Sequence, residues 1–186
     1  MSDLLFITGN LKKAEQISHY LDFPVTHQSY DIEEIQSLDL EKIARHKARQ
    51  AYQLAGQPVL VEDVSLVIPA LGKLPGPLVK WFLEELGCAG ILDLVSAEAD
   101  RKALASVCFV FCNGETERAF TAANEGTLAM EPSGDRGFGF DPIFIPDGKT
   151  KTVAEMTLEE QAEVSMRRKA LIGLHDWLRS HSNPTS

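Results

Sequence analysis

The segment 4–21 places the strongest constraint on the fold, because a short apolar run turns sharply into a helical pattern. Leu4-Leu5-Phe6-Ile7 is too short for a helix and apolar enough for a buried strand. Gly9 and Asn10 then break the chain, and a helical pattern follows from 11 to 21. A strand that turns into a helix directs backbone N–H groups and the positive end of the helix dipole at one point. The segment therefore predicts a strand–helix turn that suits an anion, most simply phosphate.

Polar and basic side chains surround the same turn. Thr8 and Asn10 supply hydrogen-bonding groups, and Lys12 and Lys13 supply positive charge. The segment is not a Walker loop, because the second glycine and the Gly-Lys-Ser/Thr ending are missing. A capped strand–helix turn with solvated lysines explains the same residues, so this segment alone leaves both interpretations open.

The rest of the chain mixes strand and helix patterns. We expect strands at 4–8, 25–30, 59–61, 102–112, 116–124 and 126–131, the last three forming an antiparallel meander. We expect helices at 11–21, 40–55, 78–86 and 89–97, a capping box at Thr157–Glu160, and a last helix capped by Ser165. Asp39 is the expected cap of helix 40–55. No repeat or linker interrupts the chain, so we expect residues 1–186 to form one domain, or one domain with two lobes, with 182–186 a frayed tail.

Composition limits the partners. The formal net charge is −9, which repels nucleic acid and anionic membranes, so neither is expected to bind. No apolar run approaches the roughly 18 residues of a membrane span, and no secretory signal is visible. Three cysteines without a Cys-x-x-Cys pair argue against a disulfide framework or a zinc site. We therefore expect a cytoplasmic, reducing location.

Two acidic segments are the candidate metal ligands. Glu62-Asp63 follows the apolar run Val59-Leu60-Val61, and carboxylates where a strand ends face the ligand crevice of α/β proteins. Neighbouring strand residues point to opposite faces, so only one of the two should face the site. Glu33 and Glu34 lie in an acidic loop that could fold against it. Such oxygen ligands suit Mg²⁺, although a solvated acidic loop is the commoner fate of such a run.

The glycine-rich loop 132–141 is the candidate base site. Gly137 and Gly139 free the backbone around Phe138, whose ring could stack on a planar base while Asp141 accepts base N–H groups. A tight surface turn with buried aromatics explains the loop at least as well. Zinc and serine-nucleophile chemistry are disfavoured, because there is no Gly-x-Ser-x-Gly motif and the histidines are scattered at positions 19, 27, 46, 175 and 181.

Six motifs, taken together and in this order, resemble the inosine triphosphate pyrophosphatase family. They are Thr8-Gly9-Asn10-x-Lys12-Lys13-x-Glu15, Val61-Glu62-Asp63, Leu74-Pro75-Gly76-Pro77-x-x-Lys80-Trp81-Phe82, Gly137-Phe138-Gly139-Phe140-Asp141-Pro142, Thr152-x-Ala154-Glu155-Met156 and Ser165-x-Arg167. The resemblance implies a two-lobed α/β fold with a long central mixed sheet flanked by helices. It also implies hydrolysis of ITP, dITP and XTP to the monophosphate and pyrophosphate, by a homodimer that uses one Mg²⁺ per subunit.

The same resemblance implies a role for each site residue. The triphosphate would be held by Thr8, Asn10, Lys12, Lys13, Lys47 and Lys80. The metal would be held by Glu34 and Asp63, and Asp63 would also activate water. The base would be bound by Phe138, Gly139, Phe140, Asp141, Ser165 and Arg167.

Three positions depart from the family pattern. The family usually has histidine where this chain has Met166, lysine where it has Gln161, and serine or threonine where it has Val64. The first change removes a base-reading donor and the second removes a cation, so the preferred base stays open while chemistry at Asp63 could survive. Two alternatives also stay open: the same fold acting on another modified nucleotide, and a weakly catalytic nucleotide-binding protein.

Overall fold

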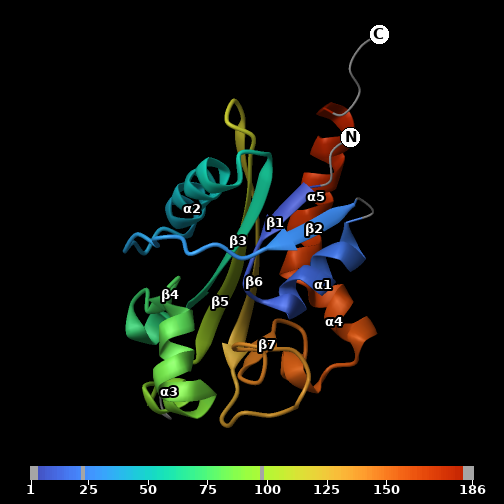
Figure 1. Ribbon diagram of the computed structural model, residues 1–186. Coiled ribbons are helices and arrows are strands. Elements are labelled where there is room, and N and C mark those ends of the chain that lie inside the picture. Colours follow the sequence, from blue (N-terminus) through green and yellow to red (C-terminus); the bar gives the residue numbers. More distant parts are fainter. Residues whose placement is uncertain (1–3, 22–23, 97–98, 182–186) are drawn as a thin grey trace. The chain divides into compact units, whose positions relative to one another are not determined.

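The computed structural model describes residues 4–21, 24–96 and 99–181 (Figure 1). Within these ranges, only the backbone is described for Leu11, Lys12, Gln16 and His19. Its strands are β1 (Leu4–Ile7), β2 (Val25–Gln28), β3 (Val59–Val67), β4 (Pro75–Gly76), β5 (Lys102–Cys112), β6 (Glu117–Leu128) and β7 (Phe144–Pro146). Its α-helices are α1 (Leu11–Tyr20), α2 (Leu40–Ala55), α3 (Val79–Asp93), α4 (Leu158–Val164) and α5 (Met166–His181). Short 3₁₀ helices span Pro69–Leu71 and Val153–Glu155.

The strands form one mixed sheet in the order β2-β1-β3-β5-β6-β7, with β4 paired to β3. β1 is parallel to both β2 and β3, whereas β4 and β7 are antiparallel to their partners. The predicted mixed α/β fold is therefore confirmed. No helix of the described residues is long and apolar enough to cross a membrane.

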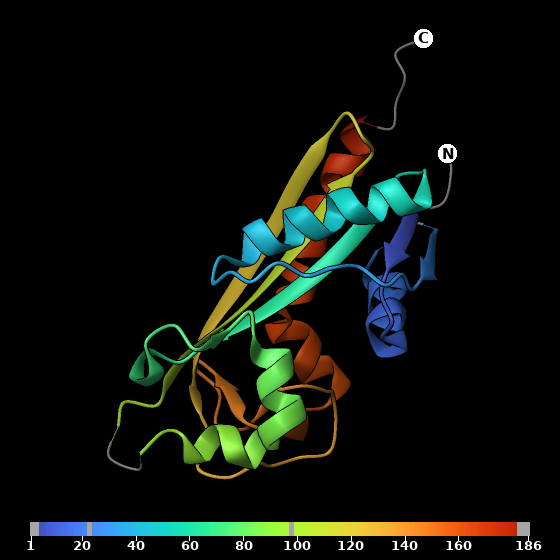
Figure 2. The same cartoon turned by 60° about the vertical axis from the view of Figure 1, so that its left-hand side comes forward.

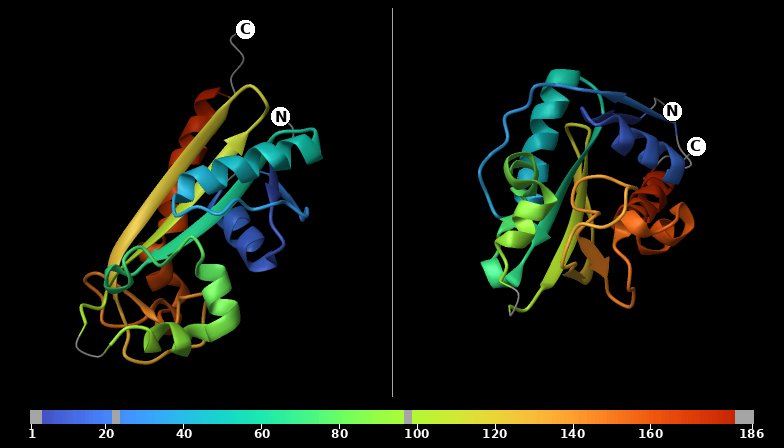
Figure 3. Two further views of the ribbon diagram at one scale, coloured as in Figure 1. Left: turned by 90° about the vertical axis from the view of Figure 1, so that its left-hand side faces the viewer. Right: turned by 90° about the horizontal axis from the view of Figure 1, so that it is seen from below.

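The chain divides into two compact units. Unit 1 holds the described residues of Met1–Asp63, Val107–Ala122 and Arg167–Ser186, and unit 2 holds those of Val64–Ser106 and Ala123–Met166. Within unit 1, α2 lies along one face of the strands, and α1 and α5 lie on the other (Figures 2 and 3). This arrangement decides which helix each residue of β3 can meet.

The core under α2 explains the orientation of β3. The helix presents small side chains at Ala44, Ala48 and Ala51, which allow it to approach the sheet closely. They pack against the buried side chains Leu5, Ile7, Val59, Val61, Cys108, Val110 and Cys112. Because strand residues alternate between faces, Asp63 follows Val59 and Val61 toward α2, and Glu62 points the other way.

The predicted end of the strand at Val61 is wrong. β3 continues through Glu62 and Asp63 to Val67, and its last residues pair with β4 at Leu66 and Val67. The apolar residues after the acidic pair support this extension, because they supply further buried side chains such as Leu66. Both carboxylates are therefore held within a strand and not in a loop beyond it.

The predicted boundary between two strands near residue 125 is also wrong. β6 is one strand from Glu117 to Leu128, and the third antiparallel strand is β7. Gly126 lies inside β6, where a Cβ would stand 2.3 Å from the carbonyl oxygen of Ile145 and 2.7 Å from Cζ of Phe144. The glycine permits close approach of β7 and does not break the strand.

The predictions for the helices agree with the structure at most ends. The side chain of Asp39 accepts a hydrogen bond from the backbone N–H of Lys42 and caps α2, and the capping box at Thr157 and Glu160 opens α4. The predicted break between helices 78–86 and 89–97 corresponds to a kink in α3 at Gly87, whose φ is 66°. The helix ends at Asp93, before residue 97, and the predicted frayed tail 182–186 lies outside the described residues.

Candidate active site

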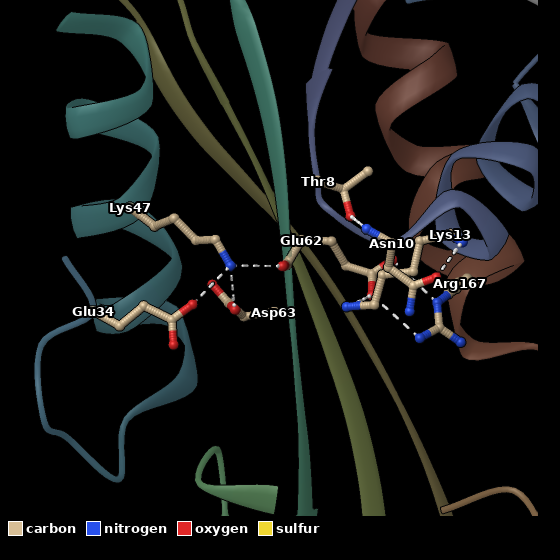
Figure 4. A network of polar contacts seen from close by, with 8 residues as sticks. All are labelled: Thr8, Asn10, Lys13, Glu34, Lys47, Glu62, Asp63 and Arg167. Atoms are coloured by element: carbon tan, nitrogen blue, oxygen red, sulfur yellow. Dashed lines mark hydrogen bonds and ion pairs between the residues drawn. The ribbon is translucent and has the colours of Figure 1, made fainter. Parts of the chain in front are cut away.

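The β1–α1 turn is closed by its own polar side chains. The hydroxyl of Thr8 accepts a hydrogen bond from the backbone N–H of Asn10 at 3.0 Å. The side-chain oxygen of Asn10 accepts one from the backbone N–H of Lys13 at 3.4 Å, so Asn10 caps α1. The side chain of Lys12 lies outside the described part of the structure. The turn therefore presents the first turn of α1 and the Lys13 side chain toward the middle of β3 (Figure 4).

Glu62 holds two cations on the α1 and α5 face of β3. Its Oε1 lies 3.0 Å from Nζ of Lys13. The Arg167 guanidinium binds it in a bidentate manner, with Nε 3.1 Å from Oε2 and Nη2 3.2 Å from Oε1. The Glu62 side chain has no exposed surface. Burial alone would raise the pKa of Glu62, but the charges of Arg167 and Lys13 outweigh it and lower that pKa from 4.5 to about 2.

The two cations come from the first turns of α1 and α5. Neither first turn contains an acidic residue, although a helix dipole favours negative charge at that end. Lys13 and Arg167 therefore need a counter-charge, and Glu62 provides it for both. The two helix starts and two cations together leave a positive charge balance on this face of β3.

Asp63 lies on the opposite face and has the opposite charge balance. The ammonium of Lys47, from α2, lies 2.9 Å from Oδ1 of Asp63 and 3.3 Å from Oε1 of Glu34, so one cation serves two carboxylates (Figure 4). Lys47 also donates to the carbonyl of Glu62 at 3.4 Å. The side chains of Lys47 and Asp63 are 17% and 16% exposed. This pair is thus largely withdrawn from water.

The ionisation of this group differs from that of Glu62. Burial raises the pKa of Asp63, and the charge of Lys47 only partly opposes this. Burial would also lower the pKa of Lys47, but attraction to Asp63 and Glu34 outweighs it and raises that pKa. The Oδ2 atom of Asp63 is buried and has no hydrogen-bond partner in the structure. A buried acceptor without a partner is costly, so this atom is suited to bind a proton or a cation.

The residues present fit a magnesium ion. Mg²⁺ binds oxygen ligands, typically one or two carboxylates, and completes its shell with water and substrate phosphates. Asp63 offers an unpaired oxygen, and Glu34 brings a second carboxylate to the same ammonium. Among the described residues there is no group of three or more acidic, histidine or cysteine side chains that could hold a metal without a substrate. The structure thus offers a two-carboxylate site and no closed metal cage in its described part.

The glycine-rich loop belongs to unit 2. Its Asp141 carboxylate accepts a hydrogen bond from the backbone N–H of Phe138 at 2.8 Å, and Cys88 of α3 donates to the carbonyl of Gly139 at 3.4 Å. Phe140 is buried and contacts Phe144 edge-on, with ring centroids 6.3 Å apart. Asp141 therefore shapes the turn that carries Phe138, and Phe140 anchors it.

Four other positions of interest also lie in unit 2. Lys80, on α3, places its ammonium 4.9 Å from the ring centroid of Trp81. Ser165 separates α4 from α5. The amide of Gln161 donates to the carbonyl of Val153 at 2.8 Å, and Met166 is only 8% exposed. Two of the three residues that depart from the family pattern, Gln161 and Met166, are thus used in local structure.

The structure brings together seven of the predicted site residues in unit 1, namely Thr8, Asn10, Lys13, Glu34, Lys47, Asp63 and Arg167. Sequence reasoning did not include Glu62 among them, although it is the carboxylate that joins Lys13 to Arg167. The signal that could have found it is the alternation itself, since a glutamate on the buried face of a strand needs a cationic partner.

Comparison with known proteins places this chain in a family. The Ham1 family model matches residues 4–177. The chain is 40% identical over 182 residues to a dITP/XTP pyrophosphatase of Methanopyrus kandleri, covering 96% of this chain and 97% of that protein. It is 35% identical over 195 residues to an inosine triphosphate pyrophosphatase of Scheffersomyces stipitis, covering 97% and 100%. The solved structure of a HAM1 protein from Coxiella burnetii has a TM-score of 0.85 at 26% identity, covering 97% and 100%.

The fold and the site define a mixed α/β protein with two carboxylates bridged by a lysine on one face of its sheet. The chain belongs to the Ham1 family. The resemblance inferred from the six motifs is therefore confirmed.

Proposed function

We propose that this chain is a nucleoside triphosphate pyrophosphatase that hydrolyses ITP, dITP and XTP to the monophosphate and pyrophosphate. The observation that carries the proposal is the Glu34–Lys47–Asp63 group, in a chain that matches proteins of that name over nearly its whole length. The family resemblance also supports a cytoplasmic homodimer with one Mg²⁺ per subunit.

Glu34 and Asp63 are the residues that would hold Mg²⁺. When bound, the ion polarises a phosphate oxygen and lowers the pKa of water. Asp63 is the candidate general base, because its Oδ2 has no hydrogen-bond partner among the described residues and burial raises its pKa. The Asp63 carboxylate would take the proton from the water that attacks the phosphate.

The lysines and the β1–α1 turn would bind the triphosphate. Lys13 and Lys47 would each bring positive charge to the phosphates, and this charge would stabilise the departing pyrophosphate. The family resemblance implies that Thr8, Asn10, Lys12 and Lys80 would also contact the phosphates.

The base would be recognised by Phe138 and by polar groups at its edge. By the family resemblance, Phe138 would stack on the ring, and Gly139, Asp141, Ser165 and Arg167 would contact the base. Phe140 anchors the loop through its contact with Phe144. Arg167 donates hydrogen bonds only, so it suits the 6-keto group of hypoxanthine or xanthine and opposes the 6-amino group of adenine. Such a mismatch leaves buried polar groups unpaired and can discriminate strongly.

A second candidate function is hydrolysis of another modified nucleotide on the same fold. Two observations favour a different substrate: Met166 is buried, and the side-chain amide of Gln161 donates hydrogen bonds to backbone carbonyls. Neither residue supplies the histidine donor or lysine charge that the family pattern provides at these positions.

The test is pyrophosphate release from ITP, dITP, XTP, GTP and ATP with and without Mg²⁺. We expect ITP, dITP or XTP to have the highest kcat/KM, EDTA to abolish turnover, and ³¹P NMR to show pyrophosphate and monophosphate. A different best substrate would favour the second candidate. Tight nucleotide binding without turnover would instead identify a nucleotide-binding protein, and release of orthophosphate would exclude the proposed bond cleavage.

A further inference from the structure

The position of the Lys47 ammonium has a consequence for metal binding. It lies between Glu34 and Asp63, within 3.3 Å and 2.9 Å of one oxygen of each. A cation between two carboxylates is the position that a divalent metal would need. Since Lys47 projects from α2, which packs closely on β1 and β3 through its alanines, the ammonium reaches this position from a fixed helix.

The charges at this position are unequal. Glu34 and Asp63 bring two negative charges, and Lys47 brings one positive charge, so the group carries one net negative charge. Removing Lys47 would double that net charge. A divalent ion entering beside Lys47 would meet a like charge at close range, whereas polyphosphate oxygens would give the ammonium another partner.

We propose that Lys47 occupies the cation position between Glu34 and Asp63 in the nucleotide-free protein, so that the chain takes up divalent metal only together with the polyphosphate. The inference rests on the proposed function for the identity of the substrate, but not for the contacts. It makes Lys47 a residue that couples metal binding to substrate binding, in addition to neutralising phosphate charge. The buried Oδ2 of Asp63, which has no partner in the structure, would gain one only in the loaded state.

Direct metal titration without nucleotide tests the proposal. Mn²⁺ is the probe, and the free ion is followed by EPR for the wild type and for Lys47→Met. We expect Lys47→Met to bind Mn²⁺ about tenfold or more tightly than the wild type. A single positive charge at this range shifts proton binding to a carboxylate by about one to three decades, and we expect it to oppose Mn²⁺ at the same oxygens in the same way. Removal of Lys47 would therefore strengthen metal binding, although this lysine is also expected to bind phosphate.

Two matched variants establish where the ion binds. Lys42→Met removes one lysine charge from the exposed surface of the same helix and should leave Mn²⁺ affinity unchanged. Adding Glu34→Gln to Lys47→Met should abolish the gain, because one of the two carboxylates is lost. An equal gain in Lys42→Met, or no gain in a folded Lys47→Met, would overturn the proposal.

The wild type provides a test that needs no variant. We expect Mg²⁺ alone to leave its melting temperature unchanged, and Mg²⁺ with inorganic tripolyphosphate to raise it by mass action. Tight binding of Mn²⁺ alone to the wild type, lost in Asp63→Asn, would refute the proposal even if Lys47→Met does not fold. Neither readout involves hydrolysis. Failure of the proposed function would appear as absent turnover with the metal results intact, and failure of this inference as the reverse.

Discussion

Glu62 and Asp63 are neighbours in β3, yet their surroundings are opposite. Glu62 has two cationic partners and no exposed surface, and its pKa falls to about 2. Asp63 shares a single cation with Glu34, keeps one oxygen without a partner, and has a raised pKa. A two-residue period sends adjacent carboxylates of one strand into environments that differ in charge, helix and burial.

The difference teaches which carboxylate is available for chemistry. The Glu62 carboxylate helps to hold α1 and α5 on the sheet through Lys13 and Arg167. A carboxylate that already has two cationic partners gains little from binding a metal ion or a proton. Asp63 is deficient in cations, so substrate, metal or proton can satisfy it. We therefore assign a structural and positioning role to Glu62 and a catalytic role to Asp63.

The largest expected effect is loss of turnover in Asp63→Asn. The amide is isosteric but cannot accept the proton of water, so kcat should fall by about 10²–10⁴-fold, the usual contribution of a general base. The melting temperature should stay the same or rise, because the variant removes a buried charge that is poorly compensated. Pyrophosphate release and thermal unfolding measure the two effects. A variant with near wild-type kcat would contradict the catalytic assignment.

Glu62→Gln should have the opposite effect to Asp63→Asn, because it should lower stability more than turnover. Removing one partner of a buried ion pair typically costs about 3–5 kcal/mol, and here two cations lose their counter-charge. The free energy of unfolding from urea titration measures the effect. The matched control is Glu117→Gln, since Glu117 also binds two cations, Arg45 and Arg49, but Arg49 is 61% exposed. The Glu117 side chain is 19% exposed and that of Glu62 is 0% exposed, so Glu117→Gln should lose less stability than Glu62→Gln. Equal losses would contradict the role assigned to burial.

The two carboxylates should also respond to pH with opposite signs. The pKa of Glu62 is lowered from 4.5 to about 2, so its contribution is complete above about pH 4.5 and is lost as pH falls toward 2. That shift corresponds to roughly 3 kcal/mol. Asp63 has a raised pKa, so its effect favours the folded state below its ordinary value of 3.8 and is lost as pH rises through the folded value.

Unfolding free energies measured from pH 2 to 7 separate these contributions. Glu62→Gln should flatten the acid limb of the profile below pH 4.5. Asp63→Asn should leave that limb in place and remove a fall in stability at higher pH. If both variants alter the same limb, the contrast between the two faces of β3 does not hold.

How much of this could be predicted from the sequence depends on the range of the contacts. The β1–α1 turn and the Asp39 cap follow from patterns within a few residues, and both were predictable. The network around Glu62 joins residues 105 positions apart, and no local pattern reports such a pair. The motifs supplied Lys13, Glu62 and Arg167 one at a time, but not the contacts that join them.

The predicted ends of β3 and β6 were wrong for a related reason. Glu62 and Asp63 resemble a strand end because charged residues are rare inside sheets, and only their partners on other elements make the interior position tolerable. Gly126 resembles a turn residue, and only the approach of Phe144 and Ile145 shows why glycine is needed within β6. In both cases tertiary contacts overrode the local signal.

The smallest expected effect lies beside Arg167, at the first residue of α5. Glu62 already occupies Nε and Nη2 of Arg167, so a further donor next to it should matter for the base. Met166→His would add one, because imidazole can donate a hydrogen bond to a 6-keto oxygen and a thioether cannot. One such bond contributes about 0.5–1.5 kcal/mol, which is up to about tenfold in kcat/KM.

We therefore expect Met166→His to raise the ratio of kcat/KM for ITP to that for ATP by up to about tenfold, mainly through better use of ITP. Met166→Leu is the control, because it keeps an apolar side chain of similar volume at a buried position and should leave the ratio unchanged. Glu62→Gln combined with Met166→His asks whether the gain needs a fixed Arg167. If the gain disappears in the double variant, Glu62 influences base selection by orienting Arg167, although Glu62 itself is assigned no catalytic role. If Met166→His lowers the use of ITP and another triphosphate remains the best substrate, Met166 instead belongs to a site shaped for that base.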